Sequence, residues 1–269
     1  MRILVTGSSS QLGEELLNQI NNSKDLHNHE IINPTRQELD LANEKLCEKY
    51  ILNKLPDLVI NLAAYTAVEN AEKNIEDAFK INALALKAFS KSIHKIGGYI
   101  IHISTDYVFD GKNNIPYTTS CKRNPLSIYG KSKAKGEEYI ENILRRNEFT
   151  IIRTSWLVSK YGNNFVKTIL NKLKSKDNKS ILKIVSDQRG CITTSKSLSK
   201  LIINLIRKKS RNESIPTHLH WSSQGETNWF EIAKSIKIFA KELKIIESEI
   251  EIVPIKSYQY KGICPRPKF

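Results

Sequence analysis

Short apolar runs alternate with longer amphipathic segments along the first half of the chain. The runs are bounded by turn-forming residues, as buried strands are, and lie at 3–6, 30–33, 58–62, 99–104 and 149–153. The segments between them have helical length and spacing, and lie at 11–21, 43–55, 68–95 and 127–146. Continuous apolar strands separated by helices predict a parallel sheet covered on both faces, and hence a Rossmann-type doubly wound α/β fold.

This alternation loosens after residue 155. Helices are predicted at 163–175, 195–209 and 227–243, and strands at 182–185 and 218–221. We therefore expect an NAD(P)-binding Rossmann domain over residues 1–155 and mainly a smaller substrate-binding lobe over residues 156–269, with some segments of the second part returning to the Rossmann core. Polar stretches at 174–179 and 208–213 predict exposed turns, and Trp221 and Trp229 are expected to pack within the lobe.

Composition restricts the class of protein. The 269 residues include 42 Lys and Arg against 28 Asp and Glu, a formal net charge of +14. The basic residues are spread along the chain without interleaved aromatics, so we expect no nucleic acid as partner; a small polyanion such as a nucleotide is compatible with the charge. No apolar run approaches the roughly 20 residues that cross a bilayer, and the chain begins directly with a strand-like segment, so we expect a cytoplasmic protein outside the membrane. The four cysteines lack metal-ligand spacing, so no metal site is expected.

The first predicted strand runs into a turn typical of dinucleotide sites. Gly7 permits a sharp turn, Gly13 lets the following helix approach the sheet, and the helix start offers backbone N–H groups to a pyrophosphate. Ser10 stands where such turns usually carry their middle glycine. Its side chain either crowds the phosphates or hydrogen-bonds to them, and a tight turn without any ligand is the alternative interpretation.

The end of the second predicted strand bears on the choice between NAD and NADP. Residues 31–36 lack the acid that would bind a ribose 2′-hydroxyl and include Arg36, whose guanidinium suits a 2′-phosphate. We therefore expect NADPH, with NADH as the alternative; Arg36 as a solvated loop charge is the other interpretation.

Tyr129 and Lys133 lie four residues apart on a predicted helix, and hence on one face. A free phenol has a pKa of about 10, and a neighbouring ammonium brings that pKa closer to neutral, as general acid–base catalysis requires. Thr105 follows the fourth strand at the edge of the sheet where such folds bind ligands, so its hydroxyl can hold a carbonyl near the phenol. A solvent-exposed helix face is the alternative interpretation. His102 alternates with apolar residues and is interpreted as a core residue.

These features resemble the extended short-chain dehydrogenase/reductases, and further segments narrow the resemblance to the dTDP-4-dehydrorhamnose reductase family. The segments keep a consistent order and lie at 61–72, 81–83, 104–111, 153–156, 162–165 and 187–190. The resemblance implies NAD(P)H-dependent reduction of the 4-keto group of dTDP-4-dehydro-L-rhamnose to dTDP-L-rhamnose. Reduction of another nucleotide-linked 4-keto sugar, or a non-catalytic nucleotide-binding regulatory role, are the alternatives. A homodimer is the candidate assembly.

The same resemblance implies residue roles. Tyr129 would be the proton donor, Lys133 would lower its pKa and hold the nicotinamide ribose, and Thr105 would orient the ketone. The expected cofactor contacts, besides Tyr129 and Lys133, are Gly7, Ser10, Gln11, Leu12, Gly13, Arg36, Asp40, Leu41, Ala63, Ala64, Tyr65 and Asn82. The expected substrate contacts are Thr66, Val68, Asp106, Tyr107, Trp156, Arg189 and Arg266.

Several of these residues have structural alternatives. Ala63 and Ala64 can be close-packing residues, Trp156 can be a core residue instead of a sugar platform, and Arg189 can order the lobe instead of binding phosphate. Asn61 is expected to be a structural partner.

Four features depart from the family pattern. Ser10 replaces a glycine, Glu69 stands where the family typically carries Asp, and Ile192 replaces a proline. The sequence also stops three residues after Arg266, where the family normally continues. These departures concern the binding of the cofactor and of the nucleotide sugar. The expected acid–base residues are all present.

Overall fold

A six-stranded parallel sheet forms the centre of the computed structural model, which describes residues 1–175, 181–247 and 249–267. Its strand order is β10-β5-β4-β3-β1-β2, and every neighbouring pair is parallel. The strands are β1 (Arg2–Thr6), β2 (Glu30–Ile32), β3 (Leu58–Asn61), β4 (Tyr99–Thr105), β5 (Phe149–Thr154) and β10 (His218–Trp221). The predicted doubly wound α/β fold is confirmed.

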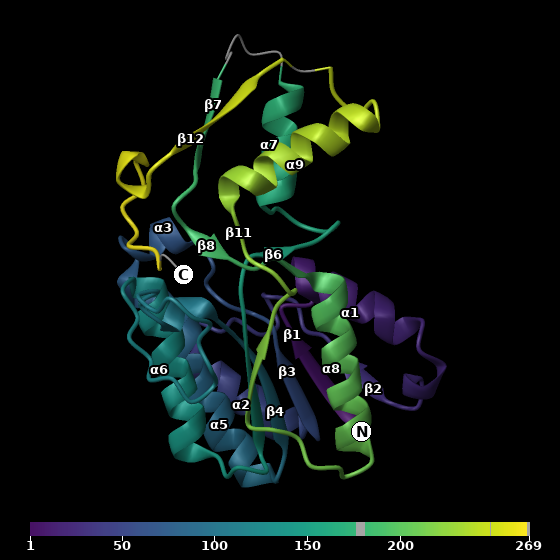
Figure 1. The fold of residues 1–269 in the computed structure, drawn as a ribbon. Coiled ribbons are helices and arrows are strands. Elements are labelled where there is room, and N and C mark those ends of the chain that lie inside the picture. Colours follow the sequence, from purple (N-terminus) through teal and green to yellow (C-terminus); the bar gives the residue numbers. More distant parts are fainter. Residues whose placement is uncertain (176–180, 248, 268–269) are drawn as a thin grey trace.

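Helices cover both faces of this sheet (Figure 1). On one face α1 (Gln11–Asn21) and α8 (Ser195–Ser210) pack together, and on the other lie α2 (Glu44–Lys54), α5 (Ala85–Ile96) and α6 (Ile128–Ile143). Because side chains alternate along a strand, Ile3 and Val5 enter the first layer of the core while Leu4 enters the second. The chain is therefore apolar throughout its strands, as a sheet buried on two sides requires.

The prediction of a single helix over residues 68–95 is wrong. The structure divides it into α3 (Val68–Ala71), α4 (Ile75–Phe79), a π-helical turn (Lys80–Leu84) and α5. The π turn lies where Asn82 exchanges hydrogen bonds with the backbone of Tyr65, accepting from its N–H at 2.8 Å and donating to its carbonyl at 3.1 Å. Asn82 also donates to the Ser132 hydroxyl at 3.0 Å. The break therefore joins the loop after β3 to α6.

The smaller lobe has its own core. Helices α7 (Phe165–Lys174) and α9 (Trp229–Glu242) pack together, and β7 (Ile181–Val185) pairs with β12 (Glu251–Ile255). Short pairs link the lobe to the sheet: β6 (Leu157–Val158) with β9 (Thr193–Thr194), and β8 (Arg189–Gly190) with β11 (Thr227–Asn228). The remaining short helices are η1 (Lys24–Leu26), η3 (Asp106–Val108) and η4 (Ser257–Gln259).

Two details of the second half differ from expectation. Trp221 ends β10 in the central sheet and does not pack in the lobe, because β10 pairs with β5. The turn predicted at 208–213 starts later, since α8 continues to Ser210. Most of the turn predicted at 174–179 lies outside the described residues. Within the described ranges, none of the helices has the length and apolar character to cross a membrane.

Candidate active site

The turn after β1 borders a cavity of about 280 Å³ at the carboxyl edge of the sheet. Of the residues expected to bind a cofactor, this cavity is lined by Gly7, Ser10, Arg36, Asp40, Leu41, Ala63 and Ala64. Thr66, expected on the substrate side, lines it as well. Three segments far apart in sequence therefore meet where parallel α/β sheets bind ligands.

The glycines of this turn are required by close backbone approaches. Gly7 has a φ of +69°, and a Cβ there would lie 2.7 Å from the Ala63 nitrogen. A Cβ on Gly13 would lie 2.3 Å from the Gly7 carbonyl oxygen. Ser10 caps α1, because its hydroxyl oxygen accepts a hydrogen bond from the Gly13 N–H at 3.1 Å. The turn is thus held in shape by Ser10 while its hydroxyl hydrogen remains available.

Arg36 extends from the loop after β2 with 82% of its side chain exposed. Its Nε lies 3.9 Å from a carboxylate oxygen of Asp40, a contact too long and too exposed to hold the guanidinium firmly. A mobile cation therefore stands at the rim of the cavity, where a phosphate can compete for it.

Tyr129 occupies the first turn of α6, which begins after the N-cap Ser127. Gly130 lets this turn lie against the neighbouring loop, since a Cβ there would come within 2.2 Å of the Tyr107 carbonyl oxygen. The rings of Tyr107 and Tyr129 meet edge to face, with centroids 5.4 Å apart. The phenol is thereby fixed at the end of β4, beside Thr105.

Burial raises the pKa of Tyr129 to about 12, a hydrogen bond with Thr105 opposes the rise, and the charge of Asp106 adds to it. The phenol is consequently protonated at neutral pH, which is the state of a proton donor. Thr105 also donates to Asp106 at 2.9 Å and accepts from the Tyr107 N–H at 3.2 Å. Burial raises the pKa of Asp106 to about 6.

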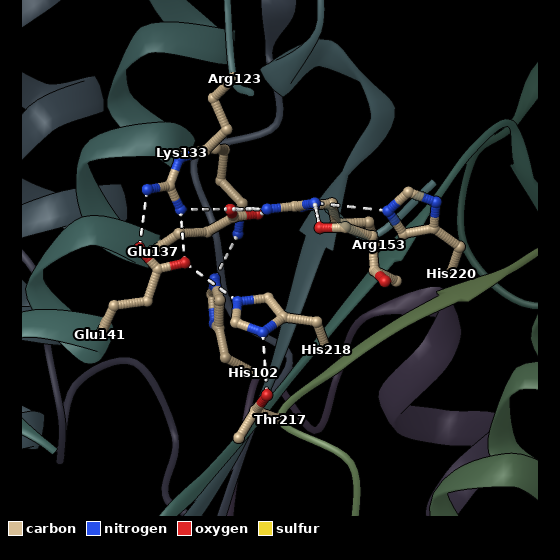
Figure 2. Close-up of polar contacts among 10 residues, drawn as sticks. His102, Arg123, Lys133, Glu137, Glu141, Arg153, Thr217, His218 and His220 are labelled. Carbon is tan, nitrogen blue, oxygen red and sulfur yellow. Dashed lines mark hydrogen bonds and ion pairs between the residues drawn. The ribbon is translucent and has the colours of Figure 1, made fainter. Parts of the chain in front are cut away.

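Lys133 lies one turn further along α6 and is 1% exposed. Its side-chain nitrogen donates to the Ile103 carbonyl at 2.7 Å. The same nitrogen lies 3.0 Å from Nε2 of His102 (Figure 2). Burial lowers the pKa of Lys133 to about 7, against the opposing charge of Glu137. Lys133 is not among the groups that shift the pKa of Tyr129, so the lowered phenol pKa expected from their spacing is not found. His102 is buried as expected, yet it contacts Lys133.

A charged network behind Lys133 ties α6 to the sheet (Figure 2). Glu137, whose side chain is fully buried, accepts hydrogen bonds from Arg153 of β5 at 2.7 and 3.0 Å and from Arg123 at 2.9 Å. Glu141 accepts from Arg123 at 2.7 Å and contacts His218 of β10 at 2.9 Å. The sequence analysis missed this network, although Lys133, Glu137 and Glu141 follow one another at the four-residue spacing of one helix face.

Four of the expected substrate residues lie at or near Tyr129. Val68 and Tyr107 pack in one apolar cluster with it. Arg266 lies near Tyr107, whose pKa its charge lowers against a larger rise from burial. Asp106 lies close enough to Tyr129 for its charge to raise the pKa of the phenol.

Trp156 and Arg189, two further expected substrate residues, contact residues of the lobe. The Trp156 ring stacks on Trp229 with centroids 3.8 Å apart, and its backbone has a φ of +43°. Arg189 forms a two-bond ion pair with Glu226. Both side chains thus have structural contacts that hold the lobe together.

Glu69 holds the C-terminal segment that carries Arg266. Its carboxylate accepts from the N–H groups of Ile263 and Cys264 at 2.8 and 3.1 Å, and from Arg266 at 2.7 Å. These contacts run from α3 to residues almost 200 positions later in the chain. Glu69 is therefore a functional candidate, as the anchor of the Arg266 segment, that sequence reasoning recorded only as a departure.

Comparison with known proteins gives consistent matches. Residues 1–269 match the family described as "RmlD substrate binding domain". The chain is 35% identical over 270 residues to the spore coat polysaccharide biosynthesis protein SpsK of Bacillus subtilis, covering 100% of this chain and 87% of that protein. It is 34% identical over 269 residues to a dTDP-4-dehydrorhamnose reductase of Sinorhizobium fredii, covering 99% and 87%. The solved dTDP-4-dehydrorhamnose reductase of Bacillus anthracis, in complex with NADP, superposes with a TM-score of 0.86 at 31% identity, covering 99% of this chain and 88% of that one.

Proposed function

The chain belongs to the dTDP-4-dehydrorhamnose reductase family, and from that premise we propose that it reduces the 4-keto group of dTDP-4-dehydro-L-rhamnose with NADPH, giving dTDP-L-rhamnose. The observation that carries the proposal is the meeting of Thr105, Tyr129 and Lys133 at the end of β4, on the same edge of the sheet as the turn from Gly7 to Gly13. A hydroxyl, a phenol and an amine at one sheet edge match the needs of ketone reduction.

The residues of the β1 turn fit a dinucleotide. The start of α1 and the backbone around Gly7 suit a pyrophosphate, and the exposed Arg36 suits a ribose 2′-phosphate. When bound there, NADPH supplies the hydride. The preference for NADPH over NADH is tested by Arg36→Ala, which is expected to weaken NADPH binding in calorimetry and leave NADH binding unchanged. Equal losses for both would argue against this role of Arg36.

The protein's own groups supply the proton and the alignment. Tyr129 is protonated at neutral pH because of its burial, so it can give its proton to the oxygen of the reduced ketone. Thr105 lies beside the phenol; its hydroxyl hydrogen, which is donated to Asp106 in this structure, would turn to the substrate carbonyl to hold it. Lys133 donates to the Ile103 carbonyl and contacts the His102 ring, and a further N–H of its nitrogen would hold a ribose hydroxyl.

Substrate binding is assigned to both parts of the chain. Val68, Asp106, Tyr107 and Arg266, which lie at or near Tyr129, would contact the sugar nucleotide, and the lobe within residues 156–269 would close over it. Trp156 and Arg189 would contribute to substrate binding indirectly, through their contacts within the lobe.

The test is NADPH oxidation with freshly prepared dTDP-4-dehydro-L-rhamnose. Tyr129→Phe is expected to lower kcat by about 10²- to 10⁴-fold while NADPH affinity is kept. Tyr139→Phe, on the same helix, is the matched control and should keep its activity, because the amines of Lys87 and Lys135 lie over the Tyr139 ring and a phenylalanine ring keeps these contacts. Wild-type turnover no higher than that of Tyr129→Phe would overturn the proposal. A parallel panel of UDP-linked 4-keto sugars distinguishes a change of substrate from a lack of catalysis.

A further inference from the structure

The carboxylate of Glu72 meets the start of the helix that carries Tyr129. Glu72 follows directly after α3, and its Oε1 accepts a hydrogen bond from the Ile128 N–H at 2.8 Å. Ile128 is the first residue of α6 and precedes Tyr129 in the chain. The first N–H groups of a helix have no partner within the helix, so Glu72 satisfies a donor that α6 itself leaves open.

Two side chains serve the N–H groups of this first turn. The Ser127 hydroxyl accepts from the Gly130 N–H at 3.0 Å, as an N-cap does. Ser127 is part of the turn and moves with it, whereas Glu72 lies 56 positions before Ile128 and belongs to another element. Of the two contacts, the one with Glu72 therefore relates the position of the turn to the rest of the molecule.

The packing around Tyr129 involves the same part of the chain. Ala71 and Ala78 are fully buried and share one apolar cluster with Tyr129 and Val68. Small side chains let the short helices α3 and α4 approach α6 closely. Because Ala71 immediately precedes Glu72, the backbone that packs in the cluster of the phenol ring also carries the carboxylate that holds its helix.

The surroundings of this contact suit a carboxylate. The start of a helix carries a partial positive charge, which attracts an anion at the first turn. Cys264 of the C-terminal segment covers the contact and is 8% exposed. Burial raises the pKa of the Cys264 thiol to about 11, and the nearby charge of Glu72 adds to that rise. A hydrogen bond shielded from water in this way is stronger than an exposed one.

The same short helix holds the segment that carries Arg266 (Figure 1). Glu69, three residues before Glu72, accepts from the N–H groups of Ile263 and Cys264 and from the Arg266 side chain. The region of α3 therefore contacts both the turn with the phenol and the segment expected to bind the nucleotide. Because the two carboxylates have different partners, their effects on kcat and KM should be separable.

We propose that Glu72 is a positioning residue for Tyr129: its hydrogen bond to the first turn of α6 holds the phenol at the end of β4, beside Thr105. This inference deepens the proposed reductase function and rests on it. A proton donor must lie within hydrogen-bond distance of the oxygen that it protonates, and a misplacement of about 1 Å can cost about 10²-fold in rate. Lys133 has its own contact with the Ile103 carbonyl, so loss of the Glu72 contact should displace the phenol and leave the lysine in place.

Substitution of Glu72 separates its hydrogen bond from its charge. Glu72→Ala removes the acceptor and is expected to lower kcat for NADPH-dependent ketone reduction about tenfold, with the NADPH affinity in calorimetry unchanged. Glu72→Gln keeps an acceptor oxygen and should recover most of kcat. Glu76→Ala on α4, which removes an exposed pair with Lys80, is the matched control and should keep the wild-type kcat. Equal rates in the alanine variants of Glu72 and Glu76, or a glutamine variant as slow as Glu72→Ala, would overturn the proposal.

The Tyr129→Phe background shows whether Glu72 acts through the phenol. In that background Glu72→Ala should leave the residual rate of ketone reduction unchanged, because the group that Glu72 positions is absent. The same fold-loss in both backgrounds would show that Glu72 acts elsewhere, and would overturn its assignment to Tyr129.

Nuclear magnetic resonance on the full chain tests the same contact without substrate. The ring signals of Tyr129, assigned by their loss in Tyr129→Phe, should shift in Glu72→Ala and stay near their wild-type positions in Glu72→Gln. The Ile128 amide should exchange about tenfold faster in Glu72→Ala, the effect of one lost hydrogen bond. Unchanged signals and exchange would overturn the proposal. If these changes occur but the wild type does not reduce the sugar nucleotide, the proposed function fails and the positioning of Tyr129 by Glu72 stands.

Discussion

Glu137→Gln removes one charge from the fully buried centre of the network behind Lys133. The carboxylate of Glu137 receives three close hydrogen bonds from Arg153 and one from Arg123, and Arg153 is itself 5% exposed. The amide of glutamine fills the same space but leaves the buried guanidinium of Arg153 without its counter-charge. Breaking a buried ion pair in this way costs about 3 to 5 kcal/mol.

The loss should be visible in thermal unfolding. In a chain of this size each kcal/mol shifts Tm by about 2–4 °C, so a loss of 3 kcal/mol lowers Tm by about 6–12 °C. Glu138→Gln is the matched control, because Glu138 is the next residue of the same helix and pairs with Lys135 at 2.8 Å on the exposed surface. An exposed pair of this kind is worth about 0–1 kcal/mol, so the control should change Tm by less than about 4 °C.

The difference in Tm between the wild type and Glu137→Gln should also depend on pH. Burial alone would raise the pKa of Glu137, but Arg153 and Arg123 hold it below the model-peptide value of 4.5. The stabilisation is therefore complete above the unfolded pKa and is lost as the pH falls through the lower folded pKa. Equal Tm losses for Glu137→Gln and Glu138→Gln at neutral pH would refute the assignment of this network as the structural tie of α6.

Three further predictions concern other parts of the site. Glu69→Gln should speed amide hydrogen exchange at residues 263 and 264 by about tenfold and raise KM for the nucleotide sugar, because Arg266 loses its ion pair. Gly13→Ala should weaken NADPH binding at least about tenfold in calorimetry, since its Cβ would lie 2.3 Å from a backbone oxygen of the cofactor turn. Iodoacetamide should modify Cys121 and spare Cys47 in the folded protein, as detected by peptide mass analysis, because hydrogen bonds from Thr118 lower the pKa of Cys121 while burial raises that of Cys47 to about 12.

Each of these predictions has a control within the chain. Glu76→Gln breaks only the exposed pair with Lys80 and should leave exchange at residue 263 unchanged. Gly97→Asn introduces a side chain where nothing lies within 4 Å and should leave NADPH affinity unchanged. Exchange that stays slow in Glu69→Gln, unchanged binding in Gly13→Ala, or early labelling of Cys47 would contradict the respective argument.

The sheet was predictable because strands buried on two faces carry an uninterrupted apolar run, which helices of the surface do not. Two of the errors in the fold arose where long-range contacts decide the structure. The break in the helix predicted over 68–95 depends on Asn82 binding the backbone of Tyr65, a contact that no periodicity reports. Trp221 was expected to pack in the lobe because the sequence does not show that β10 pairs with β5, more than sixty positions earlier in the chain.

The site was predictable to the extent that strand ends and helix faces determine it. The expected positions of Gly7, Thr105 and Tyr129 follow from their places at such ends. The contact of His102 with Lys133 and the ion pairs of Glu137 could not be read from spacing, because they depend on which strand lies behind α6. The lowered pKa expected for Tyr129 was wrong for a related reason: burial raises that pKa, and the nitrogen of Lys133 contacts His102 and the Ile103 carbonyl.

The return of α8 and β10 to the central layer has a consequence for synthesis on the ribosome. The apolar face formed by Ile3, Val5, Leu58 and Ile60 is covered in part by Ile202 and Ile206 of α8. When the first 155 residues have left the ribosome, this face still lacks its cover, and at about 5–20 residues per second the missing helix follows only after roughly 3–10 s. During that interval the nascent chain exposes the apolar face of its sheet and the unpaired edge of β5. Binding by a chaperone at this stage would therefore protect it from aggregation.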